Sequence, residues 1–254
     1  MKLIILGAGH GVPEVDRHCS GALLVTGGST YMIDCGAPVS DLMIRRGIPL
    51  TALRAVFLTH RHADHTFGLA RLLDLCNWHY LTADFDVYMT EQSGVDAMRA
   101  MICSATDTMH EDRLRLHTFG PGLVYEDENI TVTSVPTNHM NGKHPSYAFV
   151  IDAKSGEDQG KRIVFTGDLH HGDAADFPAP AKTEPSDAIV SELVHFGIPA
   201  AIEQWKNCPT KRLFITHYSN RFPLDPKAAA ELEAALSGLP FPSGLVHDGD
   251  EYEI

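Results

Sequence analysis

The chain has 254 residues, 44% of them hydrophobic, and a formal net charge of −13 with histidine counted as neutral. This composition is enough to bury a large core and excludes a disordered chain. The negative charge opposes binding to the phosphate backbone of a nucleic acid, because basic residues cluster only as adjacent pairs.

The cysteines and the apolar runs predict a cytoplasmic protein without a membrane segment. The five cysteines are widely spaced and form no Cys-x-x-Cys pair, so we expect neither disulfides nor a cysteine-bound zinc. The first apolar run, residues 3–6, is too short for a signal peptide, and no run reaches the roughly 20 residues of a membrane helix.

In chain order, short β-branched apolar runs separated by turn residues predict strands, and apolar residues at helical spacing predict helices between some of them. The predicted strands cover residues 2–6, 22–26, 31–33, 55–58, 86–89, 130–135, 147–151, 162–166, 188–190 and 212–215. The predicted helices cover residues 38–46, 66–77, 91–103 and 226–236. This mixture predicts an α+β protein whose sheets are covered by helices, in a single domain spanning residues 1–254.

The most informative motif is Thr-His-Arg-His-Ala-Asp-His at residues 59–65, directly after a predicted buried strand. Imidazole and carboxylate groups suit zinc, iron or manganese. In an extended segment His60 and His62 point the same way, so both can reach one ion. Asp64 and His65 follow where the chain turns into a helix, and can serve a second ion. A loop that is merely rich in histidine is the alternative, but a fold gains nothing from crowding four ionisable groups.

Three further candidates each follow a predicted strand: His139, Asp168 and His217. Any one of them alone is more typical of an ordinary loop residue. Their shared position at strand ends favours one site on the rim of the sheets. Residues 213–217 also repeat the pattern of residues 56–60, each a strand ending in Thr-His, which predicts that His60 and His217 share a pocket.

Taken together, this pattern resembles the metallo-β-lactamase superfamily: His-x-His-x-Asp-His, then a lone histidine, a Gly-Asp and a final Thr-His. Asp34, in a strand that ends in Asp-Cys-Gly, matches the same superfamily. The resemblance implies a four-layer αββα sandwich with two metal ions in a groove at one edge of the sheets. It implies that Asp34 orients the histidine-rich loop without binding metal. The implied ligands are His60, His62 and His139 for one ion, Asp64, His65 and His217 for the other, and Asp168 between them.

Residues 7–13, Gly-Ala-Gly-His-Gly-Val-Pro, resemble the loop of a branch that contains transfer-RNA 3′-processing nucleases and related phosphodiesterases. The spacing does not fit a dinucleotide-binding loop. Asp168 and the lack of a signal peptide argue against a β-lactamase. The His-Glu-Ala-Thr motif of those nucleases falls on residues 191–194, where Glu192 is kept but Ser191 replaces the histidine. With the acidic charge, this favours a small cyclic or linear phosphodiester over RNA.

We therefore expect a dinuclear metal-dependent hydrolase in which a metal-bridging hydroxide attacks a small phosphodiester. Two divalent ions are expected, zinc first, with manganese or iron as alternatives. The candidate catalytic residues are Asp64, Glu192, His195 and His144. His195 is the first candidate for the acid that protonates the leaving group, and a supporting or surface role is its alternative. His144 follows His139 closely and is expected to line the groove, although an ordinary loop position is equally compatible.

Other functions stay open at this level. The same site would hydrolyse an acyl substrate such as a lactone or thioester, and RNA 3′-end processing is a less favoured alternative. A non-hydrolytic metal-dependent sensor is disfavoured because all seven ligands are present, and a di-iron redox role because no flavin-binding domain is evident. A homodimer is compatible with the sequence.

Overall fold

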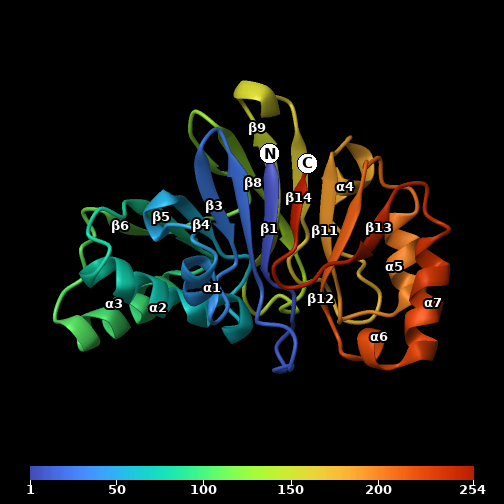
Figure 1. Ribbon diagram of the computed structural model, residues 1–254, viewed down its shortest axis with the longest axis horizontal. Coiled ribbons are helices and arrows are strands. Elements are labelled where there is room, and N and C mark those ends of the chain that lie inside the picture. The colour runs from blue at the N-terminus through green and yellow to red at the C-terminus, as the bar shows by residue number, and fades with distance from the viewer.

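The computed structural model describes residues 1–254 and shows two seven-stranded sheets packed face to face, with helices on both outer sides (Figure 1). The four-layer αββα sandwich expected from the resemblance is therefore confirmed. None of the helices combines the length and the apolar character that crossing a membrane requires.

The first sheet has the strand order β14-β1-β2-β3-β4-β5-β6. Its pairs from β14 to β3 are antiparallel and those from β3 to β6 are parallel. The strands are β1 (Lys2–Gly7), β2 (Gly21–Thr26), β3 (Ser29–Ile33), β4 (Leu53–Phe57), β5 (Phe85–Met89), β6 (Leu114–Thr118) and β14 (Glu251–Glu253).

Both faces of this sheet are apolar, because each face is covered. Leu3 and Ile5 pack into a core of 41 buried residues that the two sheets share. Ile4 and Leu6, which alternate with them along the strand, pack into a second core of 24 buried residues with the outer helices. Those helices are α1 (Val39–Arg45), η1 (Leu50–Ala52), α2 (Ala63–Trp78) and α3 (Gln92–Thr106).

The second sheet has the order β13-β12-β11-β10-β9-β8-β7, antiparallel from β7 to β10 and parallel from β10 to β13. Its strands are β7 (Gly122–Glu126), β8 (Ile130–Thr137), β9 (Ser146–Ala153), β10 (Arg162–Phe165), β11 (Ala188–Leu193), β12 (Leu213–Tyr218) and β13 (Ser243–Leu245). The helical segments of this half are η2 (Gly156–Asp158), α4 (Ala179–Thr183), α5 (Ile198–Trp205), α6 (Arg221–Leu224) and α7 (Pro226–Leu236).

Each of the ten predicted strands and four predicted helices corresponds to an observed element. The helix predicted at 66–77 begins earlier, at Ala63, so Asp64 and His65 lie in its first turn. The reason is local: His62 is extended and forms the N-terminal boundary, and the Thr66 hydroxyl donates a hydrogen bond to its carbonyl at 2.9 Å. The sequence did not predict β6, β7, β13, β14, α4, α5 and α6, which are short, largely polar or carry a proline in the first helical turn.

Candidate metal centre

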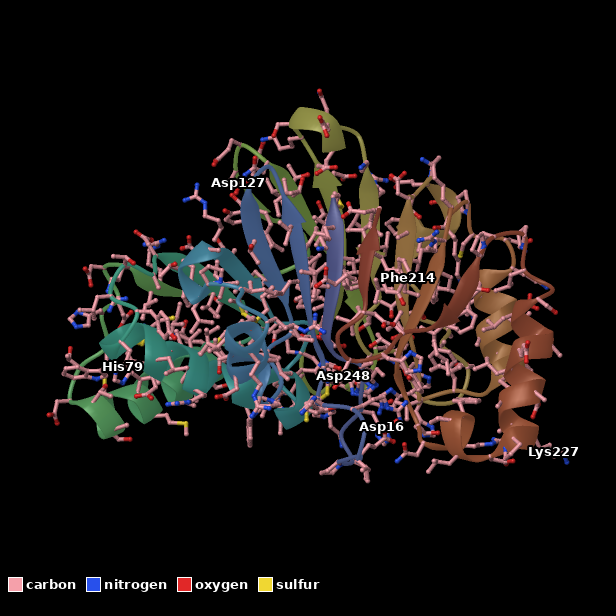
Figure 2. All side chains as sticks on the ribbon, in the orientation of Figure 1. Asp16, His79, Asp127, Phe214, Lys227 and Asp248 are labelled. Carbon is pink, nitrogen blue, oxygen red and sulfur yellow. The ribbon has the colours of Figure 1, made fainter.

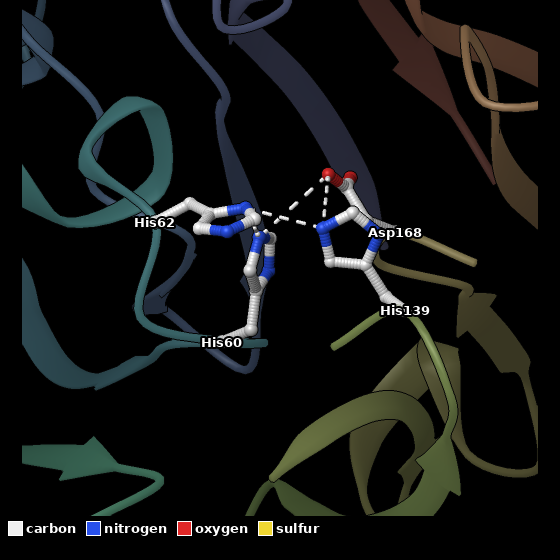
Figure 3. A group of neighbouring side chains, drawn as sticks. All are labelled: His60, His62, His139 and Asp168. Carbon is white, nitrogen blue, oxygen red and sulfur yellow. Dashed lines mark hydrogen bonds and ion pairs between the residues drawn. The ribbon is translucent and has the colours of Figure 1, made fainter. Parts of the chain in front are cut away.

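The segments that follow β4, β8 and β10 bring four side chains together at one edge of the sandwich, and we call them the first cluster. Its members are His60, His62, His139 and Asp168, whose ligand atoms lie within 4.8 Å of one another. His62 Nδ1 lies 3.0 Å from His60 Nε2 and 3.1 Å from His139 Nε2. Asp168 Oδ2 lies 3.6 Å from His60 Nε2 and 3.7 Å from His139 Nε2 (Figure 3). His62 is exposed, so the cluster opens to solvent on that side.

The hydrogen bonds around the first cluster leave its nitrogens ready for a cation. The Nδ1–H of His60 donates to the Thr59 hydroxyl at 3.1 Å, and that of His139 donates to the Leu169 carbonyl at 3.2 Å. The opposite nitrogens therefore carry lone pairs that face each other. Zinc–nitrogen bonds of about 2.0–2.1 Å in a tetrahedron separate such nitrogens by roughly 3.3 Å, close to the observed spacing. Burial lowers the pKa of His60, His62 and His139, which keeps them neutral.

A second cluster consists of Asp64, His65 and His217. His217 Nε2 is 3.2 Å from His65 Nε2 and 3.2 Å from Asp64 Oδ2. Burial opposes ionisation of Asp64, but hydrogen bonds from the two histidines lower its pKa. Burial opposes protonation of His65, but the neighbouring carboxylates of Asp168 and Asp34 raise its pKa. The buried Nδ1 of His217 has no hydrogen-bond partner and lies 3.6 Å from Asp168 Oδ1, so these residues do not close a hydrogen-bond network of their own, and their imidazole and carboxylate groups suit a cation.

Asp168 lies between the clusters. Its Oδ2 is 3.4 Å from His65 Nε2, about as far as from the first-cluster nitrogens, and its Oδ1 is 3.6 Å from His217 Nδ1. The side chain is only 3% exposed, and the surrounding histidines hold its pKa well below the usual range despite burial. The structure thus brings all seven predicted ligands together. Each cluster combines residues that follow β4 of the first sheet with residues from the second sheet.

Asp34, directly after β3, forms hydrogen bonds that support ligands of both clusters, as the resemblance implied. It accepts hydrogen bonds from the Thr59 amide at 2.8 Å, from the Thr59 hydroxyl at 3.0 Å and from His65 Nδ1 at 2.8 Å. Through Thr59 it also orients His60. Its φ of 57° is in the left-handed region, which aspartate and asparagine tolerate better than most residues.

Glu192 and His195 form a pair beside the clusters. His195 Nδ1 lies 2.8 Å from Glu192 Oε1, and its ring stacks on His217 with centroids 5.5 Å apart. The glutamate also accepts the amides of Leu169, Val194 and His195. Burial opposes protonation of His195, but Glu192 outweighs it and raises the pKa. His195 is 20% exposed, so it faces both the clusters and solvent.

Ser191, where the nuclease motif has histidine, faces the other way. Its hydroxyl accepts a hydrogen bond from the indole of Trp205 on α5 at 3.2 Å, and the residue is fully buried. Side chains alternate along β11, so Glu192 faces the clusters and Ser191 the helix. A histidine at position 191 would therefore point toward α5 and not toward the clusters.

His144 does not join either cluster. Its Nδ1 lies 3.0 Å from Glu91 Oε1 and 3.0 Å from the Arg61 guanidinium, and its side chain is 37% exposed. The sequence analysis did not identify Glu91 as a partner. Nor did it identify Thr59 or the Leu169 carbonyl, although both are adjacent to predicted ligands.

The fold and the arrangement of these side chains define a member of the metallo-β-lactamase superfamily. The chain belongs to the family described as Anti-Pycsar protein Apyc1, whose model matches residues 1–233.

The chain is also similar to individual proteins, over part of its length in sequence and over nearly all of it in structure. A ribonuclease Z from a Cyanothece species is 30% identical over 141 residues, which cover 55% of this chain and 43% of that protein. This chain thus spans less than half the length of that relative. Among solved structures, the metallo-β-lactamase fold protein YhfI from Bacillus subtilis has a TM-score of 0.76 at 19% identity, with 99% of this chain and 98% of that chain covered. A diphosphatase from the PhnP family has a TM-score of 0.70 at 18% identity, with 100% and 97% covered. At these identities the two structures show the fold alone.

Proposed function

We propose that the protein is a dinuclear metal-dependent hydrolase that cleaves a small phosphodiester, cyclic or linear. The observation that carries this proposal is the position of Asp168, whose carboxylate lies between two groups of metal-ligand type. One ion would be held by the first cluster and the other by the second, with this carboxylate shared.

Two divalent ions, zinc first and manganese or iron as alternatives, suit these imidazole and carboxylate groups. Such a pair lowers the pKa of water toward neutrality and neutralises charge that develops on a phosphoryl group. The protein's own contribution is to fix the ligands in place. Asp34 and the Leu169 carbonyl fix the tautomers of His65 and His139, so that one nitrogen of each ring stays free for an ion.

In this proposal, His195 protonates the leaving group. A phosphodiester with an alkoxide leaving group needs a proton, and this imidazole lies beside the clusters with Glu192 behind it. Glu192 holds the ring in one orientation and favours its charged form. Asp64, the other catalytic candidate near the clusters, is placed to hold a cation. We give His144 no role in catalysis, because its contacts are with Glu91 and Arg61.

The substrate class follows from relatives and from charge. The curated relatives named ribonuclease Z support phosphorus chemistry. The net charge of −13 favours a substrate with few phosphates over a long RNA. RNA 3′-end processing remains the second candidate, because ribonuclease Z is what the curated relatives are called. A lactone or thioester is the third, since the same site would attack a carbonyl carbon.

A substrate panel tests the proposal. The protein loaded with zinc or manganese is incubated with bis(p-nitrophenyl) phosphate, a cyclic nucleotide phosphodiester, an RNA with a 3′ extension, a lactone and a thioester. We expect turnover of the small phosphodiesters, abolished by His62→Ala and unchanged by His79→Ala, an exposed histidine at the far end of α2 (Figure 2). Turnover of only the acyl compounds, or of only the RNA, would overturn it.

The role of His195 has its own test. A proton donor matters for an alkyl leaving group and hardly for p-nitrophenolate, which leaves without a proton. We expect His195→Gln to lower kcat for an alkyl phosphodiester by about 10²–10⁴-fold and to affect the nitrophenyl ester much less. An equal loss for both substrates would contradict proton donation.

A further inference from the structure

Two half-buried aspartates outside the metal clusters, Asp248 and Asp176, each fasten a different side of the metal centre to the rest of the fold. Neither belongs to a cluster, and the nearest ligand in each case is held through backbone groups. The contacts of the two aspartates do not overlap.

Asp248 closes the N-terminal loop, residues 8–20, against the C-terminal turn. Its Oδ1 accepts the amide of Ala8 at 2.8 Å, and its Oδ2 accepts the amide and the Nδ1–H of His18 at 2.7 and 2.6 Å. One carboxylate therefore holds both ends of the loop. Figure 2 shows this residue just above the loop that carries Asp16.

The loop that Asp248 closes lies against two ligands of the second cluster. The Ala8 carbonyl accepts the amide of His217 at 2.8 Å, and this histidine has a φ of 47°, which is strained for a residue with a side chain. A Cβ placed on Gly11 would lie 3.3 Å from Asp64 Oδ2, so the loop backbone lies directly against that ligand. Loss of the Asp248 contacts would release the support of His217 and Asp64 together.

Asp176 does the same for the first cluster. Its Oδ2 accepts the amide of Asn138, the residue before His139, and its Oδ1 accepts the amide of His170 at 2.8 Å. The segment 168–176 carries the Leu169 carbonyl that fixes the His139 ring at 3.2 Å. Asp176 thus ties the segment that carries His139 to the segment that orients it.

We propose that Asp248 and Asp176 are positioning residues that set the metal affinity of the two clusters separately, Asp248 for the second cluster and Asp176 for the first. This inference rests on the proposed dinuclear centre. Groups that orient metal ligands are worth about 10–100-fold in metal affinity when removed. Asp248 supports Asp64 and His217, and Asp176 supports the segment around His139, so the loss of either aspartate lowers the affinity of its own cluster most. The shared ligand Asp168 begins the segment that Asp176 holds, so loss of Asp176 also has a smaller effect on the second cluster.

The test compares Asp248→Asn and Asp176→Asn with two matched controls. Asparagine has the same shape, but its amide NH₂ would face backbone N–H groups that donate. Asp250→Asn changes a carboxylate in the same C-terminal turn that bonds only to His247 and Tyr252. Asp173→Asn changes an exposed carboxylate in the same loop as Asp176. Each apo protein is titrated with Zn²⁺ against a chromophoric chelator, and anomalous diffraction from crystals grown with one equivalent of Zn²⁺ locates the ion.

We expect Asp248→Asn to weaken one of two zinc sites by 10–100-fold and to keep its single ion in the first cluster. Asp176→Asn should show the reverse, and both controls should match the parent protein. His18→Ala, which removes only the exposed side-chain contact to Asp248, should weaken the second cluster less, and it serves if Asp248→Asn fails to fold. Unchanged affinities, or equal weakening of both sites by either variant, would overturn the inference. A parent protein that binds fewer than two ions would instead overturn the proposed function.

Discussion

Asp34→Asn is the sharpest test of how the fold prepares the metal centre. The substitution keeps the shape of the side chain and tolerates the φ of 57° at this position, so the backbone need not change. The asparagine oxygen can still accept the Thr59 amide. Its NH₂ group would then face the Nδ1–H of His65, which now donates to the carboxylate at 2.8 Å. To avoid two opposed donors, the proton of His65 must move to Nε2, the nitrogen that faces His217 3.2 Å away.

The expected cost follows from that one contact. A hydrogen bond to a charged group contributes about 1.5–3 kcal/mol. At about 1.4 kcal/mol per factor of ten, the affinity of the second cluster for Zn²⁺ should fall roughly 10–100-fold. The zinc affinity of the first cluster should fall less, because His60 does not contact Asp34 directly and is linked to it through the Thr59 hydroxyl, 3.1 Å from His60 Nδ1.

Competition titration of the apo protein with Zn²⁺ measures both affinities. The control is Asp127→Asn, which removes a half-buried carboxylate that accepts the Tyr31 hydroxyl at 2.6 Å, far from the clusters. That variant should lower the melting temperature without changing either affinity. Zinc affinity of Asp34→Asn equal to that of the parent protein at the second cluster would refute the reasoning.

Three further predictions concern stability. A Cβ on Gly68 would lie 2.4 Å from the Gly36 carbonyl oxygen, so Gly68→Ala should lower the free energy of unfolding in denaturant by about 1–3 kcal/mol. The control is Gly94→Ala, whose Cβ would meet only the end of the Met89 side chain at 3.1 Å and which should be neutral or stabilising. Burial opposes ionisation of Asp158, but hydrogen bonds from Lys161, the N-terminal amine and Thr26 lower its pKa. The Asp158 carboxylate therefore stabilises the protein above the ordinary carboxyl pKa of 3.8, and this stabilisation is lost as the pH falls below it. The difference in melting temperature between Asp158→Asn and the parent protein should shrink on acidification. A difference that stays constant with pH would contradict the ion pair. The melting temperature should rise with the zinc concentration at which the protein is loaded and should fall when a chelator removes the metal. A melting temperature that the chelator leaves unchanged would argue against bound ions.

The sequence predicted the interior of the fold better than its edges. Most of the strands that it predicted are largely buried and carry nearly continuous apolar runs, such as β1 and β12. It missed β6 and β14, whose residues are largely polar or charged because they lie at sheet edges. Their pairing depends on neighbours far away in the chain, which local patterns do not report.

In the candidate site too, local sequence patterns revealed some residues and not others. Metal-binding groups at strand ends were recognisable, because His60 and Asp168 closely follow buried strands and His217 lies in the last residues of β12. Apart from Asp34, the groups that support the ligands were not recognisable, because they are backbone groups and aspartates such as Asp248, whose partners lie more than 200 residues away in the sequence. Only the folded chain shows which of its many carboxylates, 33 in all, face a metal ligand.

The composition of each cluster from both sheets has a consequence for how the protein is made. All residues of the first cluster are synthesised by the time Asp168 has been added, whereas the second cluster needs His217 in β12. A chain still attached to the ribosome therefore carries a complete set of ligands for one ion long before it carries the set for the other. In the proposed dinuclear centre, metal uptake would then be ordered in time, and both ions would need the two sheets to have packed together, because each cluster draws ligands from both.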